Sequence, residues 1–382
     1  MNNYLKRYRV TLNTLLPVHI GSGEVIGKKE FIFDKKNSNI YYPDTHGMIG
    51  ALKRKGLLEE YERFLLGGFG DLYTFLTSNA IPYGEWSGAP ISVRGIVDYK
   101  FNVINTFVKD PYGLPYIPGS SIKGAIRNII LVHEAWRRRE SGAPVDTRLN
   151  PTGSRYDMNR EAARIEAELL NVLHRNKGNK FEAVNDIMAA FRFGDSDPVG
   201  REELTICRKI DGPAVALNRA PNRLSTYREC IKPGVKITLS LTVDTELLSN
   251  LSFSNVFEQK KFKMMDGTEK TMPVILAKIF NFNRIYTKDF QKYFSEIDYL
   301  EPDVLYLGGG TGFMTKTMLL GLLDNRKRLD FTSRYLSNRF RKHKHDEDKN
   351  IGVSPHTIKL TEYNGRLSEM GKCAFDVAEV QI

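Results

Sequence analysis

The chain has 382 residues, of which 41% are hydrophobic and 26% charged, and its formal net charge is +11 at pH 7. That length allows one large or two modest domains with an apolar core, and the excess of positive charge favours a polyanionic partner, with nucleic acid the leading class. Three widely spaced cysteines without a CxxC pair argue against a zinc ribbon and a disulfide framework. The cysteines are expected to be reduced core residues of a cytoplasmic protein. No stretch approaches the roughly 20 apolar residues of a membrane span.

The predicted elements begin with a half-buried strand over residues 4–16, where apolar and polar side chains alternate. A glycine-rich turn follows at residues 19–23. A strand pair is expected at 30–34 and 40–43, joined by a Lys/Asn/Ser-rich turn. The pattern then predicts helix between residues 48 and 66.

Short strands are expected between residues 86 and 107. A helix then begins with Ser120 as its N-cap and runs to about Arg139. The next stretch, 141–157, is rich in Gly, Pro, Ser and Arg and predicts a loop. An amphipathic helix is expected over 160–175.

In the second half, residues 191–198 are expected to end a helix and enter a turn, and 235–243 form a period-two strand. Residues 253–294 are mixed and partly helical. The charge run at 338–350 lacks apolar periodicity and predicts a solvated loop. This mixture of strands and helices favours an α+β protein of antiparallel sheets with helices on one face.

The start of the helix at Ser120 is a candidate anion site. A Pro-Gly turn bends the chain just before it, and free backbone N–H groups and the helix dipole attract negative charge there. The hydroxyls of Ser120 and Ser121 add donors, while Lys123 and Arg127 share one helix face. Gly124 leaves room for close approach. The alternative interpretation is a well-capped helix with a solvated basic face.

A second candidate lies at residues 307–317. Four of five successive positions in it are glycines: Gly308, Gly309, Gly310 and Gly312. Glycine stabilises neither helix nor strand, so these residues indicate a special conformation or a close approach. Backbone amides in such a loop can form an anion-binding nest, and Lys316 can neutralise a phosphate. The segment matches neither a P-loop nor the dinucleotide-binding fingerprint, and a plain tight turn remains the alternative.

A third candidate is the turn at His19, Gly21 and Ser22. A histidine beside glycines after a strand can act as a general base or stack on a base, but it more often holds its own loop by hydrogen bonds. The remaining histidines show no metal-binding pattern, and His343 and His345 lie in the charge run. We therefore expect no metal site and no cofactor.

These segments together resemble the RAMP proteins of CRISPR effector complexes. The resemblance is greatest to the subunit that caps the type III-A (Csm) complex at the 3′ end of the guide RNA (crRNA). The matching segments run through nearly the whole chain: 19–23, 116–127, 191–198, Glu229 before a Pro-Gly pair, 307–317 and 353–359.

The resemblance implies RRM-like (ferredoxin-like) modules. We expect one at residues 1–245, with helical insertions at about 47–105 and 140–190, and a second at 246–382 that contains the glycine-rich loop. It also implies crRNA as a ligand, and the backbone RAMP subunit and a small helical subunit as neighbours. It implies a part in crRNA 3′-end maturation and antiviral defence, with host trimming nucleases as further partners.

One departure from the family pattern bears on catalysis. Backbone RAMP subunits carry a target-cutting aspartate after the turn that resembles residues 19–23, whereas residues 21–31 here contain no Asp. The resemblance therefore implies a non-catalytic cap. In such a cap, Lys123, Arg127 and Lys316 are expected to bind phosphates, and Phe313 is expected to stack on a base.

Three alternatives stay open at this stage. The first is a metal-independent endoribonuclease that cuts the repeat RNA, with His19 as base and Lys28 or Lys123 stabilising charge. The second is a backbone RAMP subunit of the same complex. The third is a protein-interaction scaffold whose basic surface is secondary.

Overall fold

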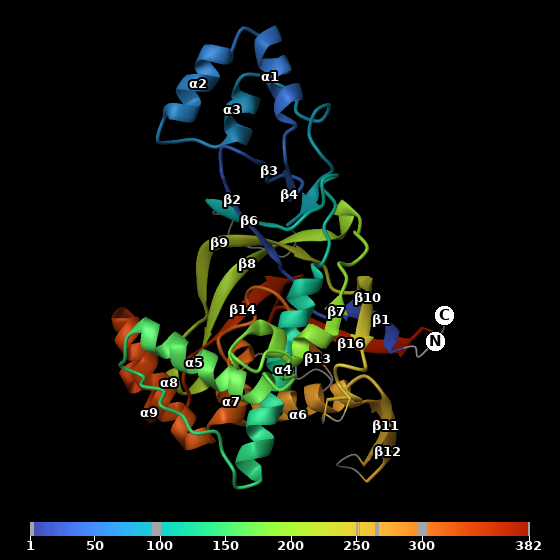
Figure 1. Cartoon of the computed structure of the whole chain (residues 1–382). Helices are drawn as coiled ribbons and strands as arrows, with labels where there is room; N and C mark the ends of the chain where they lie inside the picture. Colours follow the sequence, from blue (N-terminus) through green and yellow to red (C-terminus); the bar gives the residue numbers. More distant parts are fainter. Residues whose placement is uncertain are drawn as a thin grey trace.

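Figure 1 shows the computed structural model of the chain, which describes residues 4–93, 101–249, 251, 253–263, 267–295 and 304–380. A five-stranded sheet brings the two ends of the chain together, because β1 pairs antiparallel with both β10 and β16. The sheet has the order β13-β16-β1-β10-β7. Its strands are β1 (Leu5–Thr14), β7 (Phe191–Phe193), β10 (Lys236–Asp244), β13 (Val304–Tyr306) and β16 (Lys372–Glu379).

The predicted strands at 4–16 and 235–243 are confirmed by β1 and β10. Tyr8, Val10 and Leu12 alternate with more exposed neighbours and are each at most 4% exposed. Burial of this one face sets the register, because a one-residue slip would turn every apolar side chain toward solvent.

The second sheet follows the order β2-β6-β9-β8-β5-β4-β3, and β14 extends it by pairing with β8 and β15. Most pairs are antiparallel, but β5 with β8 and β6 with β9 are parallel. The predicted strand pair at 30–34 and 40–43 is confirmed as β3 and β4. The strands are β2 (Gly21–Gly27), β3 (Ile32–Asp34), β4 (Asn39–Tyr41), β5 (Ile91–Ser92), β6 (Val103–Phe107), β8 (Leu204–Pro213), β9 (Asn222–Ile231), β14 (Thr357–Tyr363) and β15 (Arg366–Ser368).

Three helices stand at the end of the molecule farthest from the other helices (Figure 1). They are α1 (Thr45–Arg54), α2 (Leu58–Leu66) and α3 (Leu72–Ser78). These helices pack around an apolar cluster of their own that includes Leu52, Leu72 and Trp86. The cluster explains how a helical insertion can hold its shape away from the main core.

The remaining helices pack against the sheets below the insertion (Figure 1). The longest, α4, buries Ile122, Ile126, Ile129 and Ile130 in the main core. Its predicted end near Arg139 is confirmed. These elements are α4 (Gly119–Glu140), α5 (Arg155–Leu170), α6 (Val274–Asp289), α7 (Leu319–Leu322), α8 (Asn325–Arg339) and α9 (Asp348–Ile351), with a separate hairpin of β11 (Gln259–Lys263) and β12 (Glu269–Pro273). Among the described helices, none has the combination of length and apolar character that crossing a membrane needs.

Three local predictions were wrong. Residues 191–193 form strand β7 rather than a helix end, because they pair with Leu241–Val243 of β10. The helix expected at 160–175 runs instead over Arg155–Leu170, because the Ser154 hydroxyl caps the amide of Asp157 at 3.1 Å. The run 338–350 is largely helical, with 3₁₀ turns at Arg341–His343 and His345–Glu347 before α9.

The α+β class is confirmed by this mixture of two sheets and packed helices. Strands from the last third of the chain enter both sheets, since β16 lies beside β1 and β14 beside β8. One continuous apolar core joins these segments. The division into modules at residues 1–245 and 246–382 stays a prediction.

Candidate nucleic-acid interface

The segment that follows β1 is anchored by His19, which is 6% exposed. Its Nδ1–H donates to the carbonyl oxygen of Glu229 at 2.6 Å, and its own carbonyl accepts from the amide of Gly309 at 2.6 Å. Burial lowers the pKa of His19 to about 4, against the opposing hydrogen bond to Glu229, and the charges of Arg228 and Lys316 lower it further. The imidazole is therefore neutral at pH 7 and links the turn after β1 to the glycine-rich segment.

The glycine-rich segment needs glycines because it packs directly against His19. A Cβ at Gly308 would lie 2.2 Å from the carbonyl oxygen of His19, and its φ of +81° also disfavours other residues. A Cβ at Gly309 would lie 2.9 Å from Cδ2 of the same histidine. Gly310 is crowded as well, whereas the nearest atom to a Cβ at Gly312 is 3.9 Å away. The first three glycines thus serve contacts inside the protein, and Gly312 has room for an outside ligand.

Gly21 and Ser22 open strand β2 on the exposed side of His19. A Cβ at Gly21 would lie 3.3 Å from Nε2 of His19. The Ser22 hydroxyl shares a 2.6 Å hydrogen bond with the Thr106 hydroxyl and accepts from the amide of Glu24 at 3.0 Å. The hydroxyl of Ser22 is therefore engaged in shaping its own turn, although the residue is exposed.

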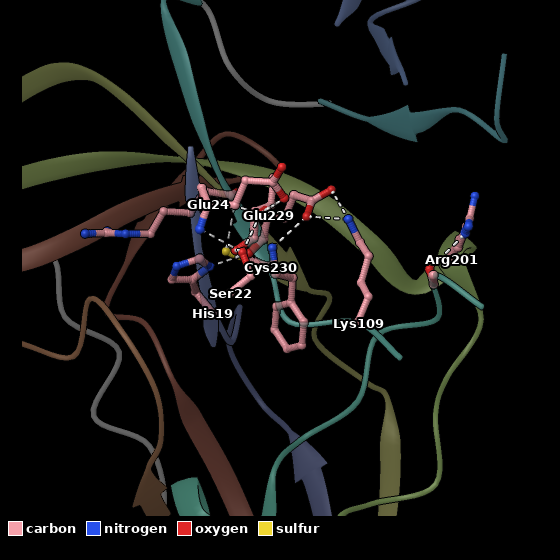
Figure 2. A network of polar contacts seen from close by, with 11 residues as sticks. His19, Ser22, Glu24, Lys109, Arg201, Glu229 and Cys230 are labelled. Atoms are coloured by element: carbon pink, nitrogen blue, oxygen red, sulfur yellow. Dashed lines mark hydrogen bonds and ion pairs between the residues drawn. The ribbon is translucent and has the colours of Figure 1, made fainter. Parts of the chain in front are cut away.

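An ion pair between Lys109 and the buried Glu229 supports this turn (Figure 2). The Glu229 carboxylate is fully buried, accepts from the amide of Phe107 at 2.6 Å and lies 2.8 Å from the Lys109 ammonium. Figure 2 shows His19 and Ser22 grouped around Glu229, with Lys109 reaching it from the other side. These contacts tie β6 to β9, so the position of the turn depends on a charge that is satisfied inside the protein.

Arg228 and Lys316 lie near His19, and Lys209 lies near Arg228. We name these three cations the Arg228 cluster. Burial lowers the pKa of Lys316, and the Arg228 charge lowers it further. Burial likewise lowers the pKa of Lys209, and the charges of Lys359 and Arg228 lower it further, whereas the Asp211 carboxylate opposes them. In the described part of the chain, none of the three forms an ion pair with a carboxylate. Positive charge without a direct ion pair to a carboxylate is the property that a phosphate-binding surface needs.

Sequence reasoning identified Lys316 but missed Arg228 and Lys209. Both lie on strands, β9 and β8, where an isolated basic residue is usually a solvated side chain. Strand pairing brings them together, because Arg228 of β9 pairs with Cys207 of β8 and Lys209 lies two positions after Cys207. A search for basic residues on neighbouring predicted strands would have found them only once the register was known.

The predicted N-cap at Ser120 was wrong. Helix α4 begins at Gly119 with Pro118 as N-cap, and the Gly119 amide donates to the Asp195 carboxylate at 2.8 Å. A Cβ at Gly119 would lie 2.3 Å from the carbonyl oxygen of Phe193, so the residue must be small for α4 to meet β7. Because Asp195 already supplies negative charge there, the helix terminus is a weaker anion site than the sequence indicated.

The two predicted cations of this helix differ in availability. The Arg127 guanidinium lies 2.8 Å from Glu166 and 2.9 Å from Asp186, so its charge is balanced within the protein. Lys123 is half-buried and forms no ion pair in the described residues; burial lowers its pKa, while nearby Asp186 opposes this. Ser120 is exposed and Ser121 half-buried. Lys123 is therefore available to bind a ligand, whereas Arg127 forms ion pairs that stabilise the protein.

A hydrogen bond joins the predicted helix to the glycine-rich segment. The Asn128 side chain of α4 donates to the carbonyl oxygen of Thr315 at 3.0 Å, next to Lys316. Gly124 is exposed with nothing within 4 Å of a Cβ, and it precedes Asn128 by an axial rise of about 6 Å. Helix α4 thus packs against the residue that precedes Lys316.

Phe313, expected to stack on a base, is half-buried. Its ring lies 6.4 Å from that of Tyr335 at an interplanar angle of 26°. It also packs against the main core. The structure therefore gives this ring a packing partner inside the protein, and base stacking by Phe313 stays a prediction.

Comparison with known proteins agrees with the sequence resemblance. The family model described as the RAMP superfamily matches residues 11–315. A protein of Mycobacterium tuberculosis named CRISPR system Cms protein Csm5 is 27% identical over 406 aligned residues that span the whole of both chains. The protein of the same name from Streptococcus thermophilus is 28% identical over 349 residues, which cover 85% of each chain.

Two solved structures share the fold. A chain in the cryo-EM structure of a Csm–crRNA–target RNA ternary complex of a type III-A CRISPR-Cas system has a TM-score of 0.63 and 22% identity, covering 97% of this chain and 100% of that one. The crystal structure of T. onnurineus Csm5 has a TM-score of 0.59 and 21% identity, covering 95% and 99%. The similarity extends over essentially the full length of the chain.

Proposed function

The chain belongs to the RAMP superfamily, and we propose that it is a non-catalytic, crRNA-binding subunit of a type III-A CRISPR ribonucleoprotein. Full-length similarity to proteins named Csm5 supports this assignment, as does the fold shared with a chain of a Csm–crRNA–target RNA complex. The observation that carries the RNA-binding part is the Arg228 cluster, whose side chains form no ion pair with a carboxylate in the described residues.

The cluster would hold the RNA backbone rather than recognise its sequence. Arg228, Lys316 and Lys209 offer charge to phosphates, and Lys123 extends this surface along α4. The open space at Gly312 allows the RNA backbone to approach closely. His19, Gly21 and Ser22 would act indirectly, by fixing the turn against which the glycine-rich segment packs. Such a surface binds with strong salt dependence and little base preference.

We further propose the capping position at the 3′ end of the crRNA. In that position the chain would contact the backbone RAMP subunit and the small helical subunit, and would take part in 3′-end maturation together with host trimming nucleases, in the cytoplasm. The absence of aspartate from residues 21–31 supports a cap over a target-cutting backbone subunit.

The site chemistry favours binding over RNA cleavage. A general base works best when its pKa is near the working pH, whereas the pKa of His19 is about 4. Its Nδ1 is also occupied by the Glu229 carbonyl. An endoribonuclease would cut repeat RNA in EDTA and lose this activity on His19→Ala; we expect no cleavage by either protein. Cleavage that depends on His19 would contradict the proposed non-catalytic role.

The decisive experiment is co-purification of the tagged chain with the assembled complex, followed by RNA crosslinking mapped to residues. We expect crosslinks near Arg228 and Lys316, concentrated at the 3′ portion of the crRNA. The matched control is Lys327, an exposed lysine on α8 whose charge is paired with Asp324. Assembly without any crosslink to the Arg228 cluster would favour the protein-interaction scaffold instead.

A further inference from the structure

The charge run at 338–350 contains a buried polar centre where a solvated loop was expected. His345 is 7% exposed and Asp348 is fully buried. Ser333 of α8 helps to form this centre by donating its hydroxyl to the His345 carbonyl at 2.7 Å. His356, just before β14, completes the group with a side chain 13% exposed. The three side chains come from α9, the turn before it and the strand β14 region, and they lie outside the candidate RNA surface described above.

The three side chains point their polar atoms at one another. His345 Nδ1 lies 3.0 Å from one carboxylate oxygen of Asp348. His356 Nδ1 contacts the other oxygen of the same carboxylate. The two imidazole rings are close and tilted, with centroids 4.6 Å apart and an interplanar angle of 34°. One nitrogen of each histidine and one oxygen of Asp348 all fall within 4.8 Å of each other.

The charge of this centre requires compensation. A fully buried carboxylate is costly unless it is paired or binds a cation. In the described part of the chain, no lysine or arginine forms an ion pair with Asp348. The Asp348 carboxylate faces one ring nitrogen of each histidine and no lysine or arginine in the described residues, so a bound cation would compensate its charge.

We propose that His345, Asp348 and His356 form a zinc-binding site. Two imidazole nitrogens and one carboxylate oxygen are a donor set that Zn²⁺ prefers, and three protein ligands leave a fourth position open. The Ser354 hydroxyl is buried and lies near the Asp348 carboxylate. Zinc at this site would clamp α9 to the start of β14, whose pairing with β8 extends the second sheet.

The first test uses the unmodified full-length chain. After treatment with EDTA and gel filtration, addition of ZnCl₂ and renewed gel filtration should leave one zinc ion per chain by elemental analysis. Co²⁺ in place of Zn²⁺ should give the strong visible absorption of four-coordinate cobalt bound by nitrogen and oxygen. Less than one-tenth of an equivalent of zinc, together with the weak spectrum of hydrated cobalt, would overturn the proposal in favour of a metal-free His–Asp–His hydrogen-bonded centre.

Variants assign the zinc to these residues. Asp348→Asn and His356→Gln should each weaken zinc binding more than 10-fold by calorimetry, and zinc should raise the melting temperature of the wild type but of neither variant. His46→Gln is the matched control, because His46 is exposed on α1, at the opposite end of the molecule from α9 (Figure 1). Equal zinc affinity of the wild type and both variants would overturn the assignment, and if a variant fails to fold, the cobalt spectrum of the wild type still decides. None of these measurements depends on RNA, so the zinc site and the proposed function can fail separately.

Discussion

Replacing Arg228 and Lys316 together by alanine should make RNA binding less sensitive to salt. Each phosphate neutralised on a single strand contributes about −0.7 to the slope of log affinity against log salt concentration. Because these two side chains have no carboxylate partners in the described residues, both charges are available, and the slope should become shallower by about 1.4. Between 50 and 200 mM salt, the wild type should therefore lose about 7-fold more affinity than the double variant.

The assay is fluorescence anisotropy of the full-length chain with a labelled single-stranded crRNA over this salt range. Lys327→Ala is the control, because its ammonium group is exposed and lies 3.9 Å from Asp324; its slope should match the wild type. A double variant with an unchanged slope would show that these cations do not meet phosphates. A double variant that loses affinity equally at all salt concentrations would indicate that Arg228 and Lys316 stabilise the binding surface instead of contacting phosphates.

Three further predictions concern stability. Gly308→Ala should lower the free energy of unfolding, measured in urea, by about 3 kcal/mol, because an αL alanine costs about 1 kcal/mol and the overlap with the His19 carbonyl adds about 2 kcal/mol. Gly365→Ala is the control: Gly365 has a φ of +75° and open space around it, so this variant should lose only the αL cost of about 1 kcal/mol. Lys109→Met should cost about 3 kcal/mol by stranding the buried Glu229 carboxylate, and a loss below about 1 kcal/mol would contradict that. Because the folded-state pKa of His19 is about 4, below the unfolded value, its contribution is complete above about pH 6.5 and is lost as the pH falls toward 4. At pH 5 this loss is about 2 kcal/mol, and His19→Asn should remove it; identical pH dependence of urea unfolding in both proteins would refute the assignment.

The sequence predicted the elements whose pattern is local. The alternation in β1 and β10 and the apolar face of α4 follow from periodic burial, and the β3–β4 hairpin from its turn residues. Residues 191–193 were wrongly predicted as a helix end, because a three-residue strand is too short to show alternation. Only its pairing with β10 defines this strand. The start of α5 was misplaced because Ser154 was not recognised as its cap.

At the candidate interface, the sequence identified the segments but not the function of each side chain. The glycines at 308–310 were correctly singled out as serving a close approach, yet the partner that approaches is His19. Lys123 and Arg127 look alike on one helix face, but only Arg127 meets Glu166 and Asp186, which come from distant positions. A carboxylate far along the chain leaves no trace in the local pattern.

Length, composition and local pattern thus determined the class of this protein, its basic character and the segments that matter, because these depend on residues that are neighbours in sequence. Only the tertiary structure decided which charges form ion pairs. Pairing of β8 with β9 brings Lys209 near Arg228, and the segment after β13 brings Lys316 near Arg228. The same holds for His345, Asp348 and His356, whose convergence depends on α9 folding against the start of β14. Compensation of charge is a property of distances in space, and the order of residues along the chain does not contain those distances.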